Sequence, residues 1–93
     1  MSNPVRRHLI FYGRVQGVAF RYRVQQICNS LGLTGWVRNC YDGSVEMEVQ
    51  GTSADISEMI RRISAQSYIE ITGIEQTELE PDPTERRFRI TGY

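Results

Sequence analysis

The sequence contains little of what metal and redox sites require. It has two cysteines, Cys28 and Cys40, which form no CxxC pair, and its single histidine, His8, cannot complete a conventional zinc set with them at these spacings. We expect both thiols to be reduced, and a disulfide between them is the less favoured alternative. The sequence therefore predicts no metal site and no cofactor.

The chain also lacks an excess of charge and a long apolar run. Eleven basic residues balance eleven acidic ones, so no field of the whole molecule attracts nucleic acid or an anionic membrane, and an anion has to be bound locally. No segment approaches the roughly 20 apolar residues of a membrane span, and residues 1–7 lack the apolar core of a signal peptide. We expect a cytoplasmic protein, monomeric by default, without nucleic-acid or membrane partners.

The periodicity of apolar residues predicts five strands and two helices within one domain over residues 1–93, a length that suits a single core. Strands are expected at about 8–12, 34–39, 45–50, 69–79 and 87–91. Helices are expected at 20–31 and, behind a cap at Thr52 or Ser53, along the apolar stripe from Ile56 to Ile63. Gly73 interrupts the fourth strand and predicts a bulge or bend there.

The order β-α-β-β-α-β plus a short last strand predicts an α+β fold, a ferredoxin-like two-layer sandwich. In this topology an antiparallel sheet carries both helices on one face. Its first two strands run in the same direction, so the loop after Gly13 and the strand end at Asn39 meet at one edge of the sheet. The topology thereby predicts that Arg21 and Asn39 lie close together.

The segment from Gly13 to Arg21 has the composition of a phosphate cradle. Gly13 and Gly17 allow tight turns that let main-chain N–H groups converge on one point, and Arg21 follows where the next helix begins. The spacing differs from GxxxxGK[ST], and no Lys-Ser/Thr pair follows, so a nucleoside triphosphate is a poor candidate ligand. A plain strand-to-helix turn is the structural alternative.

These residues suit one kind of phosphoryl transfer. Arginine donates a planar fork of hydrogen bonds to phosphate oxygens, and Asn39 can hold a water through its acceptor. Because no histidine, metal cluster or obvious general acid is expected at this edge, the leaving group has to depart unaided. An acyl phosphate meets this condition, since it expels a carboxylate whose conjugate acid has a pKa of about 4. Asn39 could otherwise simply end a strand and open a turn.

Several segments resemble the acylphosphatase family, in family order and at family spacing, within a similarity that extends from about residue 8 to residue 93. They are Gly13-Arg14-Val15-Gln16-Gly17-Val18 with Phe20-Arg21, Leu31-Gly32-Leu33, Gly35-Trp36-Val37-Arg38-Asn39 and Asp42-Gly43-Ser44-Val45-Glu46. Ala19, Val24 and the segment at 67–70 depart from the family's usual residues.

The resemblance implies metal-independent hydrolysis of a small-molecule acyl phosphate, with inorganic phosphate as product and inhibitor. It makes Arg21 the phosphate-binding arginine and Asn39 the residue that positions water. The backbone of six residues then forms the cradle: Val15, Gln16, Gly17, Val18, Ala19 and Phe20.

Two other functions remain open from the residues alone. A non-catalytic module could use the same cradle to sense a phosphorylated metabolite, although it would have little need for Asn39. Single-stranded RNA binding on the sheet is disfavoured by the neutral charge and by the absence of the aromatic RNP1 pattern.

Outside this edge, structural roles are expected. His8 is interpreted as a structural residue of the first strand. Arg61-Arg62 and Arg86-Arg87 are interpreted as solvated charge pairs, which Glu58 and Glu85 are available to offset.

Overall fold

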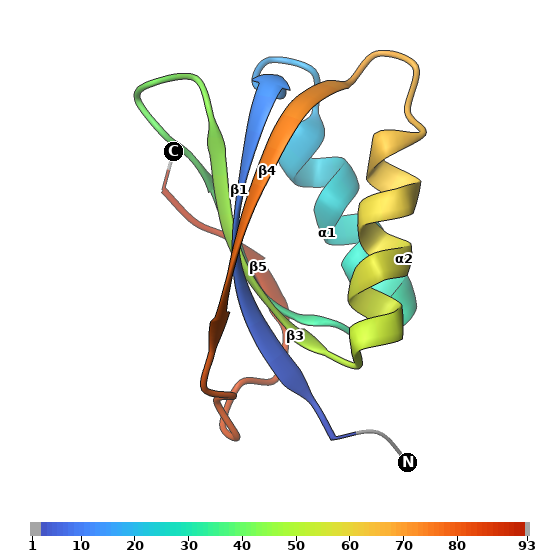
Figure 1. The fold of residues 1–93 in the computed structure, drawn as a ribbon, viewed down its shortest axis with the longest axis vertical. Coiled ribbons are helices and arrows are strands. Elements are labelled where there is room, and N and C mark those ends of the chain that lie inside the picture. The colour runs from blue at the N-terminus through green and yellow to red at the C-terminus, as the bar shows by residue number, and fades with distance from the viewer. Residues whose placement is uncertain (1–2, 93) are drawn as a thin grey trace.

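The computed structural model describes residues 3–92, which form one five-stranded sheet and two helices. The order along the chain is β1 (Val5–Arg14), α1 (Phe20–Leu31), β2 (Thr34–Asn39), β3 (Val45–Gly51), α2 (Ser53–Ser64), β4 (Glu70–Leu79) and β5 (Phe88–Ile90). Both helices cover the same face of the sheet (Figure 1). The expected ferredoxin-like α+β sandwich is confirmed.

The strand order in the sheet is β4-β1-β3-β2-β5. β1 pairs antiparallel with β3 and β4, and β2 pairs antiparallel with β3, so β1 and β2 run in the same direction. β5 is added to β2 as a parallel strand at the edge. In Figure 1 the loop after β1 and the connection from β2 to β3 consequently lie at the same end of the sheet.

The core lies between the sheet and the helices and is built by the predicted periodicities. β3 turns alternate residues inward, and each helix contributes the stripe expected for it, because a period of two buries one face of a strand and a period of 3.6 buries one stripe of a helix. The buried core residues include Leu9 and Phe11 of β1, Val45, Met47 and Val49 of β3, Val24, Ile27 and Cys28 of α1, and Ile56, Met59 and Ile63 of α2.

β1 is longer than its apolar run predicts. The expected strand covered residues 8–12, whereas the ladder between β1 and β4 extends from the pair Arg6–Leu79 to the pair Arg14–Glu70. Pairing with both β3 and β4 keeps the first residues of β1 extended, and pairing with β4 alone continues the strand to Arg14. The bulge predicted from Gly73 is present: Tyr12 is paired with Gly73 and Gly13 with Ile71, so Thr72 is the extra residue.

The 80–87 loop crosses the end of the sheet opposite the β2–β3 connection (Figure 1). Side chains of β1 and β3 hold it there. Arg6 donates to both carboxylate oxygens of Glu85 at 2.7 and 3.2 Å and to Glu48 at 2.9 Å. Gln50 bonds the main-chain oxygen and nitrogen of Asp82. The expectation that Glu85 offsets Arg86-Arg87 is corrected, because the crossing of the loop places Glu85 against Arg6. Glu58 does pair with Arg61 and Arg62 as expected.

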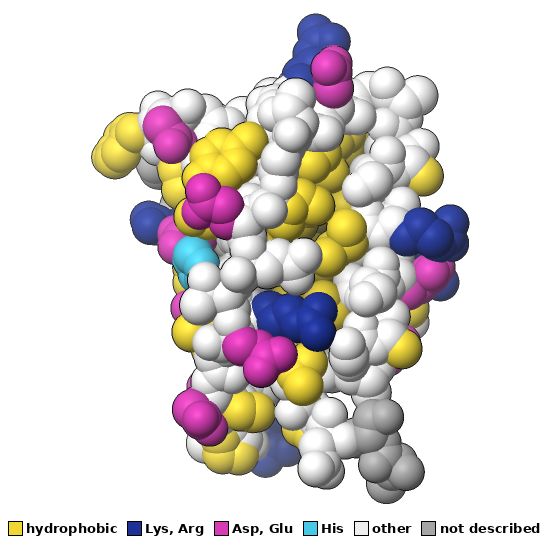
Figure 2. Space-filling view, in the orientation of Figure 1, with side chains coloured by type: hydrophobic (Ala, Val, Ile, Leu, Met, Phe, Trp, Pro, Cys, Tyr) yellow, Lys and Arg dark blue, Asp and Glu magenta, His cyan; other side chains and the backbone are white. Residues whose placement is uncertain are grey.

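The surface shows no one-signed field on the face seen in Figure 2, where acidic and basic side chains lie next to one another. This distribution agrees with the zero formal net charge of the chain. Hydrophobic atoms are visible in the space between α2 and β4 on the same face. Within the described chain, neither helix has the length and apolar character that would let it cross a bilayer.

Candidate active site

The 15–19 loop follows the end of β1, where Gly13 lies against the backbone of β4. Gly13 has a φ of 121°, and a Cβ at this position would lie 2.1 Å from the carbonyl oxygen of Glu70, so only glycine fits. Further along the loop, Gly17 has a φ of 73° and Ala19 a φ of 59°, while Val18 between them does not have a positive φ. Alternation of this kind turns successive N–H groups toward one side of a loop.

The N-terminus of α1 has no side-chain cap, in contrast to that of α2. In α2, Thr52 accepts a hydrogen bond from the N–H of Asp55 through its hydroxyl oxygen, at 3.1 Å. In α1 the N-cap residue is Ala19, which makes no side-chain bond, and the first turn contains no acidic residue. The first N–H groups of α1 and its positive dipole end therefore face the loop without an acidic or capping side chain.

Phe20 fixes the start of α1 in the core. Its side chain is 2% exposed and its ring meets that of Phe11 edge to face, with the centroids 5.2 Å apart. Val15, at the other end of the loop, is also buried. The loop between these two anchors is thus held over the edge of the sheet, with Gly17 and Ala19 exposed.

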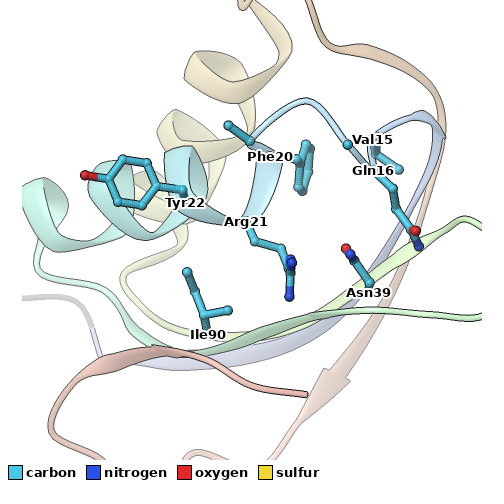
Figure 3. A pocket seen from close by; sticks show the side chains of 9 residues that line it. Val15, Gln16, Phe20, Arg21, Tyr22, Asn39 and Ile90 are labelled. Carbon is cyan, nitrogen blue, oxygen red and sulfur yellow. The ribbon is translucent and has the colours of Figure 1, made fainter. Parts of the chain in front are cut away.

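Arg21 and Asn39 line one pocket of about 200 Å³ beneath this loop. Arg21 extends from the first turn of α1 and Asn39 from the last position of β2, and Figure 3 shows both polar ends directed into the space between helix and sheet. The predicted juxtaposition of these two residues is confirmed. It follows from the parallel direction of β1 and β2, which brings distant segments to one edge.

The amide of Asn39 presents an acceptor that the protein does not use. Its Oδ1 is buried and, within residues 3–92, is the one buried side-chain polar atom without a hydrogen-bond partner. A buried acceptor without a donor costs about 1–3 kcal/mol, so such an atom is retained where a ligand or water completes it.

Gln16 connects the loop to the β2–β3 connection. Its Nε2 donates to the carbonyl oxygens of Cys40 at 2.7 Å and Ser44 at 2.8 Å. Those residues also bond each other, since the N–H of Cys40 donates to the oxygen of Ser44 at 2.9 Å. Asp42 stabilises the turn by accepting from the hydroxyl and the N–H of Ser44, and these bonds hold the pKa of its carboxyl below the usual range.

Seven of the eight residues predicted for the site line the pocket, namely Val15, Gln16, Gly17, Ala19, Phe20, Arg21 and Asn39. The eighth, Val18, is half-buried and packs against the core. Tyr22 and Ile90 also line the pocket and were not predicted. Tyr22 is the neighbour of Arg21, whereas Ile90 could be found only by knowing that β5 joins β2.

The cysteines and the histidine lie outside the lining of this pocket. Both cysteines are free, and burial raises the pKa of the Cys28 thiol to about 12. His8, on β1, has its Nε2 within hydrogen-bond distance of the carboxylate of Glu46. This contact is the largest cause that lowers the pKa of Glu46, and the hydrogen bond and charge of Arg38 lower it further. Among residues 3–92, no three histidine, cysteine, aspartate or glutamate side chains gather as a metal would require.

The fold and the pocket define a small ferredoxin-like α+β protein in which an arginine and an asparagine share a pocket beneath a glycine-containing loop. Residues 7–90 match the sequence model of the acylphosphatase family. The chain therefore belongs to the acylphosphatase family, whose members are enzymes that act on small-molecule acyl phosphates.

Individual relatives agree with this assignment. The acylphosphatase of Chlorobaculum tepidum is 44% identical over 86 residues, which cover 91% of this chain and 94% of that one. The acylphosphatase of Bifidobacterium longum is 46% identical over 63 residues, 68% of this chain and 65% of that one. The crystal structure of the Bacillus subtilis acylphosphatase superposes with a TM-score of 0.86 at 32% identity, covering 95% of this chain and 99% of that one.

Proposed function

We propose that this chain hydrolyses acyl phosphates to a carboxylate and inorganic phosphate without a metal ion, with Arg21 binding the phosphoryl group and Asn39 positioning the attacking water. The observation that carries the proposal is the pocket, which places the partnerless acceptor of Asn39 in the same space as the guanidinium of Arg21 and the uncapped start of α1.

The phosphoryl group is bound by main-chain and side-chain donors together. The alternating φ values of the 15–19 loop and the uncapped N-terminus of α1 supply N–H groups and a positive dipole end, which favour an anion. Arg21 adds a planar fork that matches two phosphate oxygens. An anion at this position also offsets the unfavourable placement of an arginine at the positive end of a helix.

Asn39 orients the water through Oδ1. A water that donates one hydrogen to this oxygen directs a lone pair at the phosphorus of a group held beneath the loop. The new bond forms between the water oxygen and phosphorus, and the bond between phosphorus and the acyl oxygen breaks with its electron pair on the departing carboxylate. The water proton passes to phosphate oxygen or solvent.

The leaving group explains why so few residues suffice. A carboxylate departs unprotonated at neutral pH, so the site needs no general acid. Phosphoryl transfer passes through a loose transition state with charge on the equatorial oxygens, so that positioning and electrostatic stabilisation supply most of the rate. The arginine, the loop donors and the amide provide both.

The test is hydrolysis of acetyl phosphate in the presence of EDTA. We expect turnover far above the spontaneous rate, competitive inhibition by inorganic phosphate, and, in ¹⁸O-labelled water, label in the phosphate and none in the acetate. Turnover no faster than the spontaneous reaction would favour a non-catalytic phosphate-sensing module. Label in the acetate would mean attack at carbon and would contradict the role of Asn39.

Arg21→Gln tests the phosphate site separately. Loss of a bidentate charged partner costs about 3 kcal/mol, so we expect the inhibition constant of phosphate to rise about 100-fold and turnover to fall. Arg23→Gln is the matched control, because Arg23 lies two residues further along α1 and donates to Tyr68 and Gln26. Equal effects of the two substitutions would contradict the assignment of Arg21.

A further inference from the structure

We propose that Gln16 is a positioning residue that sets the distance between the phosphate loop and the water held by Asn39. The proposal rests on the proposed function, since it concerns the geometry of that same pocket. It assigns a task to the side chain of Gln16, in addition to any N–H contact made by its main chain.

The amide of Gln16 completes the bonding of two carbonyl groups. The oxygen of Cys40 accepts from the N–H of Gly43 and the oxygen of Ser44 accepts from the N–H of Cys40, so the turn holds itself together through one bond to each oxygen. Gln16 donates from Nε2 to both oxygens as well, at 2.7 and 2.8 Å. Both hydrogens of the NH₂ group are thereby used, and each carbonyl has two donors.

This pair of bonds joins the two halves of the proposed site. On one side, Gln16 directly follows the buried Val15 and precedes Gly17, inside the loop that would hold the phosphoryl group. On the other side, Cys40 directly follows Asn39, so its α-carbon lies about 3.8 Å from that of Asn39. A shift of the Cys40 carbonyl therefore moves Asn39 relative to the loop.

The side chain is suited to this task because it offers two hydrogens at one atom. Asn39 has no hydrogen-bond partner at its own Oδ1 to hold the amide in place, so its position depends on the backbone of the strand end. A displacement of about 1 Å between reacting groups can cost about 100-fold in rate. Gln16 keeps the strand end fixed without entering the reaction.

The first test is Gln16→Met, which keeps the length of the side chain and removes both donors. We expect kcat to fall 10- to 100-fold while the inhibition constant of inorganic phosphate changes less than about threefold, because the loop still binds and the water is displaced. Gln66→Met is the matched control, since Gln66 also donates from Nε2 to a main-chain carbonyl, that of Arg62, at the end of α2. An unchanged kcat in Gln16→Met overturns the proposal.

The second test is a double-mutant cycle with Asn39→Ala. If Gln16 acts through Asn39, Gln16→Met causes no further loss of kcat in the Asn39→Ala background. The same fold-loss in both backgrounds, or a rise in the phosphate inhibition constant equal to the loss in kcat, would show that Gln16 acts on the loop instead. Full activity of Asn39→Ala alone would refute the proposed function and is distinguishable from both results.

Gln16→Glu keeps the proposal testable if Gln16→Met folds poorly. An ionised carboxylate facing two carbonyl oxygens is repelled, whereas a protonated one can donate one hydrogen bond. We expect the activity of this variant, relative to that of the unsubstituted chain, to rise as the pH falls from 7 toward about 4.3, the ordinary pKa of glutamate. A ratio independent of pH over this range counts against the positioning role.

Discussion

Arg6→Met tests how strongly the end of the sheet opposite the candidate site is held together. The side chain of Arg6 is 7% exposed and that of Glu85 is 9% exposed, and four hydrogen bonds join Arg6 to Glu85, Glu48 and Gln50. Removing the arginine leaves the largely shielded carboxylate of Glu85, and the more exposed one of Glu48, without their charged partner.

The expected cost is about 3 kcal/mol, at the low end of what breaking a buried ion pair costs. A domain of this size is stable by about 5–15 kcal/mol, so the loss is a large fraction of the total. It corresponds to a fall in melting temperature of about 12–24 °C, at 4–8 °C per kcal/mol. Urea unfolding measures the change, with an unchanged m-value as the sign that stability alone has moved.

The double variant Arg6→Met/Glu85→Leu separates the pair from its surroundings. Replacing Glu85 as well removes its unpaired carboxylate and leaves that of Glu48, which is 25% exposed and can be solvated. We therefore expect this variant to be more stable than Arg6→Met by about 2 kcal/mol. A loss below about 1 kcal/mol in Arg6→Met, or a double variant less stable than the single one, would refute the reasoning.

Activity provides the control for this experiment. Arg6 lies near the beginning of β1, whereas Asn39 of the pocket is level with Phe11 through the pairs Asn39–Val45 and Val45–Phe11. Phe11 lies five residues, about 17 Å, further along the strand. Below the transition temperature, kcat of Arg6→Met should therefore remain within about twofold of the unsubstituted chain. A large fall in kcat in the folded variant would mean that the hydrogen bonds of Arg6 also shape the pocket.

Three further predictions concern single positions. Ala19→Gly should raise the free energy of unfolding by about 0.5–1 kcal/mol in urea, because relief of the positive φ of 59° exceeds the entropy that glycine adds to the unfolded chain; a loss of stability would contradict this. Arg61 and Arg62 hold the pKa of Glu58 at about 2, below the ordinary 4.5, so the contribution of Glu58 to stability is present above pH 4.5 and is lost as the pH falls toward 2. Glu58→Gln should therefore flatten the decline of the free energy of unfolding between pH 4.5 and pH 2. Equal slopes of this free energy against pH in the variant and the unsubstituted chain would count against the prediction. Ellman's reagent at pH 8 should modify Cys40 before the buried Cys28, and Cys40→Ser should leave no fast-reacting thiol.

The parts of the fold that depend on local pattern were predictable. α1 begins and ends where its stripe and Gly32 indicated, because a glycine at a φ of 71° provides the left-handed stop. The cap of α2 fell on Thr52, one of the two residues expected. The meeting of Arg21 and Asn39 was also predictable, since it follows from strand direction alone.

Other features depend on contacts between distant segments, which periodicity does not encode. The length of β1 is set by pairing on both of its sides, and the partner of Glu85 by the path of the 80–87 loop across the sheet. The place of Ile90 in the pocket required the parallel pairing of β5 with β2. The two bonds of Gln16 join positions 24 and 28 residues apart.

The most direct test of the separate roles proposed for Asn39 and Arg21 is a comparison of Asn39→Ala with the unsubstituted chain on acetyl phosphate. Because the amide is assigned to the water and the loop with Arg21 to the phosphoryl group, we predict a fall in kcat of about 100-fold or more with the inhibition constant of phosphate nearly unchanged. Asn29→Ala, on the exposed side of α1, serves as the control. Retention of full kcat by Asn39→Ala, or a loss of phosphate binding equal to the loss of rate, would contradict the account.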